Sequence, residues 1–372
     1  MFQQALQFMR YDKPKTIGAV LGVIVAIFLI GQQAGIFIFL TGLMTTLVDH
    51  SSADIWVTSN KALEANRLGT LDMSYARELK SIPGIREVSP MVVAGASARL
   101  SNGEQLPVQL VGPGAPEFLI EPWRIVEGEV SGLLDKGGIS VDVFDLKSID
   151  ELHVGEPLEI NGERVYVKIV TSGARGFGGS LVLTTAERAR HLGKVDPNTA
   201  SALLITVKEG YSVDSVVAQI NKSFFGIRAW EREAFSSQTR KVNLGNSGIG
   251  TSTFTLIIFA ILSGMVIIGL TLYSAAIERL NDFATMKAIG ASNGYVTRII
   301  IMQALLIATV GFILAAFLLV GFQLGIANAG IFFDYGWKLW LGLIVATLVL
   351  SLGGALLAVN RIRKVEPASV FR

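Results

Sequence analysis

The sequence predicts an α-helical membrane protein with four transmembrane helices and a large α+β domain between the first and second helices. Three observations support this prediction. Only 17% of the 372 residues are charged, whereas soluble domains carry about 25%, and the mean hydropathy is +0.52. Four apolar runs each reach the about 20 residues that one helical crossing needs. Between the first two runs, residues 49–250 are mixed polar and apolar and contain no spanning segment.

The N-terminal region predicts a surface helix followed by one transmembrane helix. Residues 1–15 alternate apolar and polar side chains and end in basic ones, which is typical of an amphipathic helix on the cytoplasmic membrane surface. Residues 16–48 form an apolar run that is longer than one crossing requires, so we expect the helix to continue past the bilayer as a stalk. The run is too long for a cleavable signal, and no A-x-A-like site follows it.

Residues 49–250 predict a water-exposed domain whose two ends share one pattern. Each end reads strand, helix, turn, strand: Ile55–Thr58, Ser74–Ser81, Pro83-Gly84 and Glu87–Ala94 at the first, and Leu203–Val207, Val213–Phe224, Gly226 and Ile227–Trp230 at the second. Two β-α-β units in the same order predict a ferredoxin-like split fold. The polar residues 231–250 then predict a partly helical stalk that leads back to the membrane.

The middle of this domain, about residues 110–193, predicts an inserted and mostly β subdomain. Asn161-Gly162 between Leu158–Ile160 and Val165–Val170 favours a tight hairpin. The glycine-rich run Gly173–Ser180 predicts a mobile loop rather than a strand. It lacks the GK[ST] of a phosphate-binding loop.

Three further apolar runs, with Trp337 and Trp340 at an interfacial position, predict the remaining transmembrane helices at residues 253–277, 295–322 and 337–359. Lys and Arg precede the first helix, lie between the second and third, and follow the fourth in the tail, residues 360–372. The connector 323–336 has neither. The positive-inside rule therefore places both termini and the connector 278–294 in the cytoplasm, and residues 49–250 on the other side.

The stretch Glu278–Ser292, here called the 278–292 segment, is too polar for lipid and is flanked by two apolar runs. Phe283, Met286 and Lys287 fall at i, i+3 and i+4, so they share one face of a helix. Gly290 predicts the end of that helix, and Asn293 is placed to cap the next one. We predict a cytoplasmic contact helix for a partner protein, with contact residues Glu278, Arg279, Asp282, Phe283, Met286, Lys287 and Gly290. The alternative is that these charges only cap a helix at the lipid headgroups.

Polar and small residues stand out in the first transmembrane helix. Gln32 and Gln33 are costly in lipid unless they are paired or face a cavity. We expect a hydrogen bond between helices, and the alternative is a substrate or gating contact. The spacings Gly18-x-x-x-Gly22 and Gly31-x-x-x-Gly35 allow close approach of a second helix. A dimer through this helix is therefore predicted, with packing residues Gly18, Gly22, Gly31, Gln32, Gln33 and Gly35.

No enzyme motif is present in the sequence. It lacks H-E-x-x-H, G-x-S-x-G and a Walker A motif, has no cysteine, and has three separated histidines. We expect no catalytic residue, no metal site and no ATP bound in the P-loop manner, and the net charge of +2 gives no argument for nucleic acid. Asn221-Lys222-Ser223 matches a short glycosylation sequon. The acidic residues expected on the solvated surface are Asp142, Asp145, Asp150 and Glu151.

The layout of one helix, a large domain and three more helices is similar to that of the FtsX/MacB-type permeases of ABC transporters, the mechanotransmission superfamily. The motif E-R-x-x-D-F-A-x-M-K-A-I-G-A-S at Glu278–Ser292 resembles the family's segment after its second helix. The tail RIRKVEPASVFR at Arg361–Arg372 looks like the family's closing basic segment. Tyr11–Lys15 and the Gln-containing first helix resemble DevC-like permeases more than MacB, and this chain has no fused ATPase domain.

The resemblance implies a permease of the bacterial inner membrane that works as a homodimer with a separate ABC ATPase subunit. That partner would use ATP and Mg²⁺, while this chain, surrounded by membrane lipid, would bind no cofactor. The 278–292 segment would be the coupling helix, and both stalks would continue from their membrane helices as rigid levers. The family further implies a periplasmic adaptor, an outer-membrane channel, and export of a lipid, peptide or small hydrophobic compound.

Two alternatives remain within the resemblance. One is an exporter of haem or another toxic metabolite, for which Met44 and His50 are the nearby candidate axial ligands. The other is a non-transporting regulator of a cell-wall hydrolase, as FtsX is.

Overall fold

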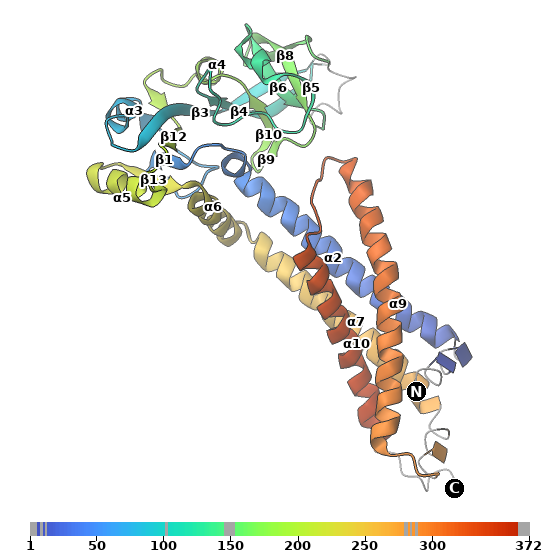
Figure 1. Cartoon of the computed structure of the whole chain (residues 1–372). Coiled ribbons are helices and arrows are strands. Elements are labelled where there is room, and N and C mark those ends of the chain that lie inside the picture. Colours follow the sequence, from blue (N-terminus) through green and yellow to red (C-terminus); the bar gives the residue numbers. More distant parts are fainter. Residues whose placement is uncertain are drawn as a thin grey trace. The chain divides into compact units, whose positions relative to one another are not determined.

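The computed structural model describes residues 6–7, 10–11, 13–100, 103–144, 153–278, 282, 285–286 and 289–363. The chain divides into two compact units (Figure 1). The helical unit contains residues 1–38, 249–328 and 332–372. The α/β unit contains residues 39–248 and 329–331.

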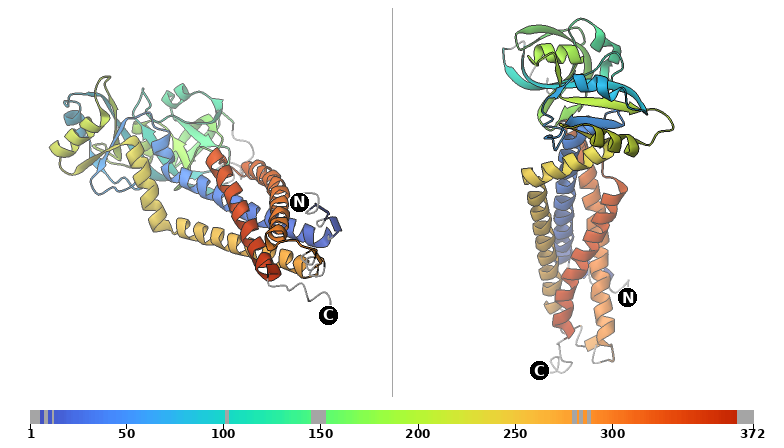
Figure 2. Two further views of the ribbon diagram at one scale, coloured as in Figure 1. Left: turned by 60° about the horizontal axis from the view of Figure 1, so that its bottom comes forward. Right: turned by 90° about the vertical axis from the view of Figure 1, so that its left-hand side faces the viewer.

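The described part of the chain has four helices that are long and apolar enough to cross a membrane: α2 (Lys13–Asp49), α7 (Ile249–Glu278), α9 (Asn293–Ala327) and α10 (Trp337–Arg363). They match the four predicted spans. Within the helical unit α10 packs against both α7 and α9, and all four run side by side (Figure 2). Their shared core includes Ile27, Ile268, Leu319 and Leu350, each fully buried.

Helix α2 is longer than a bilayer requires. Its 37 residues span about 55 Å at 1.5 Å per residue, against a hydrocarbon core of about 30 Å. Residues up to Ile38 belong to the helical unit, and Phe39–Asp49 belong to the α/β unit. A single uninterrupted helix therefore enters both units.

The predicted ferredoxin-like fold is confirmed by the strand order. The antiparallel strands run β13-β1-β12-β3, where β1 is Ile55–Ser59, β3 is Ile85–Arg99, β12 is Ala202–Val207 and β13 is Ile227–Glu231. Helices α3 (Ser74–Leu79) and α5 (Val213–Ser223) connect the strands of each β-α-β half. Alternate strand residues and both helices bury one apolar core, in which Val57, Leu79 and Ile220 are inaccessible to solvent.

Strand β3 joins this fold to the inserted subdomain. Its first half pairs with β12, and Met91–Arg99 pair with β4 (Gln105–Pro113). The remaining elements are β5 (Ile125–Gly128), η1 (Val130–Leu134), β6 (Gly138–Asp142), β7 (Pro157–Ile160), β8 (Glu163–Thr171), β9 (Arg175–Gly176), β10 (Gly179–Leu183) and α4 (Ala186–Leu192). The β7–β8 hairpin turns at Asn161 and Gly162 with φ of 49° and 87°, the left-handed pair that a tight hairpin needs.

Two expectations for this subdomain are wrong. The glycine-rich run Gly173–Ser180 is not simply a loop, because Arg175 and Gly176 pair with Ser180 and Gly179 in the β9–β10 hairpin. Asp142 is not solvated: it is 1% exposed and accepts hydrogen bonds from the Thr171 hydroxyl at 3.0 Å and the Ala174 amide at 2.7 Å. Its carboxylate satisfies local donors that only the folded chain brings to it. Asp145, Asp150 and Glu151 lie outside the described residues.

A short sheet of β2 (Leu71–Asp72) and β11 (Thr199–Ala200) completes the strands, and α6 (Arg232–Ser247) follows β13. The expectation that the second stalk runs straight into its membrane helix is wrong. Gly248 lies between α6 and α7 in the left-handed conformation, with φ of 66°, and ends α6. The first stalk is continuous with α2, whereas the second is interrupted.

Candidate functional site

The 278–292 segment contains a helical turn that ends at a glycine. Gly290 has φ of 102°, and the amide of Ala291 donates to the carbonyl of Met286 at 2.9 Å. A left-handed glycine with a bond back over five residues is the Schellman arrangement of a helix end, so Gly290 ends the helix as the sequence predicts. Three of the predicted contact residues, Arg279, Phe283 and Lys287, lie outside the described residues.

The cap of the following helix is Ser292, not Asn293. Ser292 has extended backbone angles and its hydroxyl accepts a hydrogen bond from the amide of Tyr295 at 3.2 Å. Asn293 is the first residue of α9. Serine and asparagine are comparable N-caps, so residue type alone could not separate two neighbours.

Glu278 forms an ion pair with Lys15. Lys15 lies in the first turn of α2 and Glu278 is the last residue of α7, so the pair joins the start of the 278–292 segment to the first transmembrane helix. The side chain of Glu278 is 62% exposed and that of Lys15 is 22% exposed. Glu278 therefore remains accessible to a partner while it is held by the chain itself.

Among the described residues of this segment, the exposed apolar side chain is one that the sequence analysis did not name. Met286 is half-buried and packs against the helical core. Ile289 is 81% exposed, directly before the turn at Gly290. Asp282 is exposed as well. An isoleucine next to a helix-ending glycine was the available signal, because a residue at a turn has few neighbours to cover it.

Three of the four glycines predicted at the dimer contact face helices or loops of their own chain. A Cβ atom on Gly22 would lie 2.6 Å from the Ile267 side chain, one on Gly31 would lie 2.5 Å from Leu319, and one on Gly35 would lie 2.5 Å from Phe333. Their packing role is therefore within the helical unit. Gly18 has no atom within 4 Å of its Cβ position.

Gln32 and Gln33 are both half-buried. Within the described part of the chain the structure gives neither side chain a hydrogen bond. The helix-to-helix hydrogen bond expected from the sequence is thus not made inside this chain's described residues.

A second site lies in the α/β unit, where the end of α2, the loop 60–68 and α6 meet. Asn66 donates its amide to the carbonyl of Met44 at 2.9 Å and to Glu64 at 3.3 Å. The Asn243 amide also donates to Glu64, and the backbone amide of Ala65 donates to the Thr239 hydroxyl at 3.0 Å. The loop is thereby bonded to both helices.

Asp49, the last residue of α2, adds a direct connection to α6. Its two carboxylate oxygens accept hydrogen bonds from the hydroxyls of Thr45 and Ser236, each at 2.6 Å, and the Arg240 guanidinium lies 4.0 Å away. A small cleft of about 230 Å³ opens beside this contact. We call the whole cluster the stalk joint; its members are Met44, Thr45, Asp49, Glu64, Ala65, Asn66, Ser236, Thr239, Arg240 and Asn243.

The hydrogen-bonded polar groups of the stalk joint are buried, which stabilises the joint. Glu64 and Asn243 are each 8% exposed, and Thr239 is fully buried. Around them Val48, Ala65 and Phe235 belong to one apolar cluster with the central strands of the sheet. Buried polar groups that are mutually hydrogen-bonded fix one arrangement, because breaking any bond leaves an unsatisfied group in the core. The stalk joint can therefore hold the end of α2 (residues 39–49), α6 and the sheet as one body.

Comparison with known proteins decides the family. A model of the MacB-like periplasmic core domain matches residues 16–223, more than half of the chain, and a model of the FtsX-like permease C-terminal domain matches residues 254–367. The chain belongs to the MacB/FtsX family of ABC transporter permeases.

Relatives of this permease align with most or all of the chain at low identity. It is 25% identical over 391 residues to an uncharacterized ABC transporter permease of Mycobacterium tuberculosis, with 100% of this chain and 99% of that protein covered. It is 22% identical over 360 residues to the macrolide export ATP-binding/permease protein MacB of Acinetobacter baylyi, covering 86% of this chain and 51% of MacB. The solved periplasmic region of MacB from Actinobacillus actinomycetemcomitans covers 55% of this chain at 12% identity, with a TM-score of 0.39.

The two candidate haem ligands of the permease have other environments. Met44 is 1% exposed and lies in the stalk joint. The ring of His50 stacks on Trp123 with 4.1 Å between ring centroids, and its Nδ1 is 2.9 Å from the carbonyl oxygen of Thr46. The buried thioether of Met44 gives no support to axial ligation from this pair.

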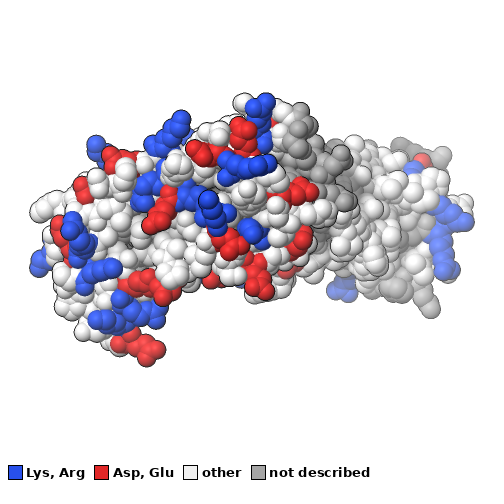
Figure 3. All heavy atoms as spheres, turned by 90° about the horizontal axis from the view of Figure 1, so that it is seen from above, with Lys and Arg blue, Asp and Glu red and all other residues white. Residues whose placement is uncertain are grey.

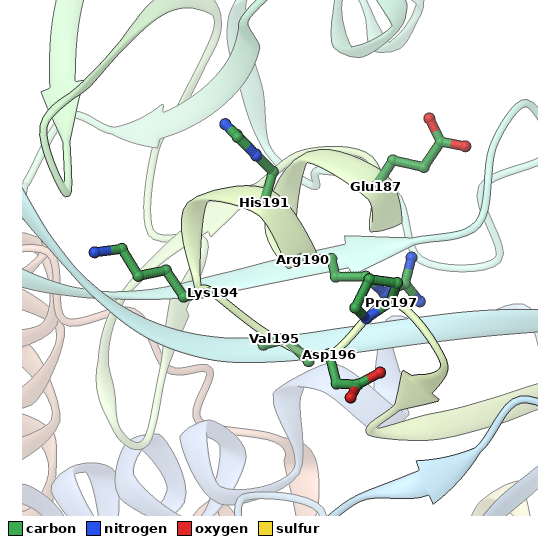
Figure 4. A pocket seen from close by; sticks show the side chains of 7 residues that line it. All are labelled: Glu187, Arg190, His191, Lys194, Val195, Asp196 and Pro197. Atoms are coloured by element: carbon green, nitrogen blue, oxygen red, sulfur yellow. The ribbon is translucent and has the colours of Figure 1, made fainter.

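The surface of the α/β unit offers a shallow hollow of about 520 Å³ beside α4 (Figure 4). The side chains of Glu187, His191 and Lys194 point away from one another there, and the Arg190 guanidinium donates to the carbonyl of Thr199 at 3.0 Å. Among the described residues no group of His, Cys, Asp and Glu could hold a metal ion. On the face seen in Figure 3 the described basic and acidic side chains are interspersed.

Asn221, the first residue of the sequon match, has a structural use in this fold. The side-chain amide of Asn221 donates to the carbonyl of Ala229 at 3.0 Å and accepts from the amide of Ala229 at 2.8 Å. Ala229 belongs to β13, the outermost strand of the ferredoxin-like sheet. Asn221 thus occupies backbone groups on which another strand could otherwise pair.

Proposed function

We propose that this permease is the membrane subunit of an ATP-driven ABC exporter and transmits work from a separate ATPase subunit to its α/β unit. In this proposal two copies form a homodimer in the bacterial inner membrane, and the cargo is a lipid, peptide or small hydrophobic compound. A periplasmic adaptor and an outer-membrane channel would receive the cargo. The basic residues flanking the spans support cytoplasmic termini and a periplasmic α/β unit.

One observation carries the proposal: helix α2 makes polar contacts with other elements at both of its ends. Lys15, in the first turn of α2, forms an ion pair with Glu278 of the 278–292 segment. Asp49, the last residue of α2, lies in the stalk joint. From Lys15 to Asp49 the helix rises about 51 Å without a break, at 1.5 Å per residue. In this proposal a displacement of the 278–292 segment would be transmitted to the α/β unit along α2.

Exposed residues of the 278–292 segment support docking of an ATPase subunit there. Ile289 supplies an exposed apolar side chain, and Asp282 and Glu278 supply exposed charges in the same segment. A few fully buried residues carry most of the binding energy of an interface, and flanking charges set orientation and rate.

Reconstitution of the full-length permease with its ATPase tests the proposal. Ile289→Asp is expected to weaken the stimulation of ATP hydrolysis by the permease at least tenfold, because a carboxylate replaces the apolar contact. The matched control Leu134→Asp, which puts the same charge on a 50% exposed residue of the α/β unit, is expected to leave stimulation unchanged. Equal stimulation in both variants would refute docking at this segment.

Charge reversal separates the two roles of Glu278. Glu278→Lys is expected to uncouple ATP hydrolysis from export because it repels Lys15 and removes an exposed carboxylate. If the ion pair with Lys15 is the whole effect, the exchange variant Lys15→Glu/Glu278→Lys regains coupling. If Glu278 also contacts the ATPase, the exchange variant stays uncoupled. The proposal predicts the second result.

The partner bound by the α/β unit distinguishes an exporter from a regulator of a cell-wall hydrolase. Purification of the intact complex from membranes is expected to recover an adaptor protein with the permease. Recovery of a hydrolase in its place would support the non-transporting alternative.

A further inference from the structure

The connector between α9 and α10 belongs to both units of the chain. Residues 249–328 and 332–372 are part of the helical unit, whereas Ala329–Ile331 are part of the α/β unit. The connector is therefore a third place, besides α2 and Gly248, where the chain passes between its two units. It returns to the helical unit directly after Ile331.

Gly330 is the residue of this connector that meets the inserted subdomain. Its φ is 78°, a left-handed conformation that favours glycine. A Cβ atom on Gly330 would lie 2.5 Å from Cγ and 2.9 Å from Cβ of Phe144, which is closer than packed carbon atoms approach one another. Gly330 is buried and Phe144 is half-buried. Two independent requirements, backbone conformation and space, therefore select glycine at this contact.

Phe144 is held from inside the inserted subdomain. The Asp142 carboxylate accepts hydrogen bonds from the amide of Phe144 at 3.1 Å, from the Thr171 hydroxyl at 3.0 Å and from the Ala174 amide at 2.7 Å. Because Asp142 is 1% exposed, loss of any of these donors would leave part of a carboxylate unsatisfied in the interior. The buried carboxylate thus joins the residue that touches the connector to the strands of the subdomain.

Helix α9 holds the other end of the connector. The side-chain amide of Gln323, near the end of α9, donates to the carbonyl of Phe333 at 2.7 Å. Helix α9 is a single helix of 35 residues that begins at Asn293, directly after the 278–292 segment. One helix and one short connector therefore link the 278–292 segment to Gly330.

We propose that the contact between Gly330 and Phe144 is a second route by which the 278–292 segment acts on the α/β unit. This route runs along α9 and through Gly330 and Phe144 to the inserted subdomain, while α2 acts on the ferredoxin-like part through the stalk joint. The inference rests on the ATPase docking of the proposed function and adds the contact through which the inserted subdomain takes part. The partner ATPase thereby moves the two parts of the α/β unit through separate contacts.

Hydrogen exchange of the full-length permease with its ATPase subunit, with and without a non-hydrolysable ATP analogue, tests the two routes together. A peptide covering residues 172–176 reports on the inserted subdomain, because its Ala174 amide donates to Asp142. A peptide covering the loop 60–68 reports on the stalk joint, because its Ala65 amide donates to Thr239. In the natural chain the nucleotide is expected to change exchange in both peptides.

Phe144→Ala removes the ring from the contact and keeps the backbone amide that Asp142 binds. It is expected to abolish the nucleotide response of the 172–176 peptide and to leave the response of the 60–68 peptide unchanged. The matched control is Phe225→Ala, which removes a 91% exposed phenylalanine of the same unit. Both responses are expected to persist in this control.

A disulfide provides a second variant that restores the attachment. The natural chain has no cysteine, and a Cβ atom on Gly330 lies within about 1 Å of the 3.5–4.5 Å separation that a disulfide needs from Cβ of residue 144. Phe144→Cys/Gly330→Cys is expected to lose both free thiols under mild oxidation. The response of the 172–176 peptide is expected to be absent in its reduced form and regained in its oxidised form.

The control pair is Glu159→Cys/Arg164→Cys. These exposed residues face each other across the β7–β8 hairpin, so their disulfide forms without touching the connector. The response of the 172–176 peptide is expected to be the same in the reduced and oxidised forms of this pair.

Four results would overturn the inference. They are a full response of the 172–176 peptide in Phe144→Ala, loss of both responses in that variant, thiols at positions 144 and 330 that stay free on oxidation, and a natural chain in which the nucleotide changes only the 60–68 peptide. The last result leaves the proposed function standing. A natural chain without either response overturns the inference as well, and the stimulation of ATP hydrolysis in Ile289→Asp then shows separately whether docking at the 278–292 segment also fails.

Discussion

Replacing Asn243 by alanine removes the hydrogen bond that joins α6 to Glu64 in the stalk joint. Both side chains are 8% exposed, so water cannot easily replace the missing donor. After the change Glu64 keeps the Asn66 amide at 3.3 Å and the Arg67 guanidinium at 3.6 Å. Both contacts are longer than a good hydrogen bond to a carboxylate.

The expected cost follows from these contacts. A hydrogen bond to a charged group contributes about 1.5–3 kcal/mol, and a buried acceptor left short of donors loses most of it. We expect Asn243→Ala to lower the free energy of opening the stalk joint by about 2 kcal/mol. This corresponds to an about 30-fold rise in the open population.

Hydrogen exchange of the full-length permease measures that opening directly. The backbone amide of Ala65 donates to Thr239 in the joint, so a peptide covering the loop 60–68 reports on it. Its exchange is expected to be about 30-fold faster in Asn243→Ala. The control Ser237→Ala, on the exposed side of α6, is expected to leave exchange within about twofold.

A double variant provides the refutation. Replacing both partners, in Glu64→Leu/Asn243→Leu, removes the buried charge together with its donor and is expected to cost less than Asn243→Leu alone. Unchanged exchange in Asn243→Ala would show that this hydrogen bond does not hold the stalk joint. Faster exchange in the double variant than in Asn243→Leu would show the same.

Two further predictions concern the helical unit. Gly31→Val is expected to lower the free energy of unfolding by about 1–3 kcal/mol, because its Cβ would lie 2.5 Å from the buried Leu319 side chain. The control is Gly42→Ala, since no atom lies within 4 Å of the Cβ position of Gly42, and thermal unfolding in detergent compares the two variants. Burial raises the pKa of Tyr335, in the connector before α10, to about 12. The stability that protonated Tyr335 contributes is complete below about pH 10 and is lost as the pH rises toward 12, so the unfolding temperature should fall in that range. Tyr335→Phe should flatten this fall. An equal fall in that variant would show that Tyr335 is not its cause.

Periodicity explains why so much of the fold could be read from the sequence. Transmembrane helices and the two β-α-β halves follow from local hydrophobic patterns, and the tight turn at Asn161 and Gly162 follows from residue type. The strand order β13-β1-β12-β3 then follows from placing two similar halves in one sheet. These features depend on residues that are near one another in the chain.

The features that the sequence did not reveal depend on distant partners. Glu64 and Asn243 are 179 residues apart, so nothing local marks either as half of a buried pair. Asp142 has the composition of a surface residue and is buried because Thr171 and Ala174 supply its donors. Gly31 and Gly35 have the spacing of a dimer contact, yet the spacing cannot say whether the approaching helix belongs to the same chain.

The break at Gly248 gives the two connections to the membrane different mechanical characters. A body held by two unbroken rods forms a closed linkage that can move only if the rods bend. Here α2 is unbroken, whereas α6 and α7 meet at a residue in the left-handed conformation, and no atom lies within 4 Å of the Cβ position of that glycine. Apart from the connector before α10, the chain thus passes between its two units once within an unbroken helix and once next to a left-handed glycine. Under the proposed function, α2 would drive the motion and Gly248 would supply the freedom that lets the stalk joint follow without strain.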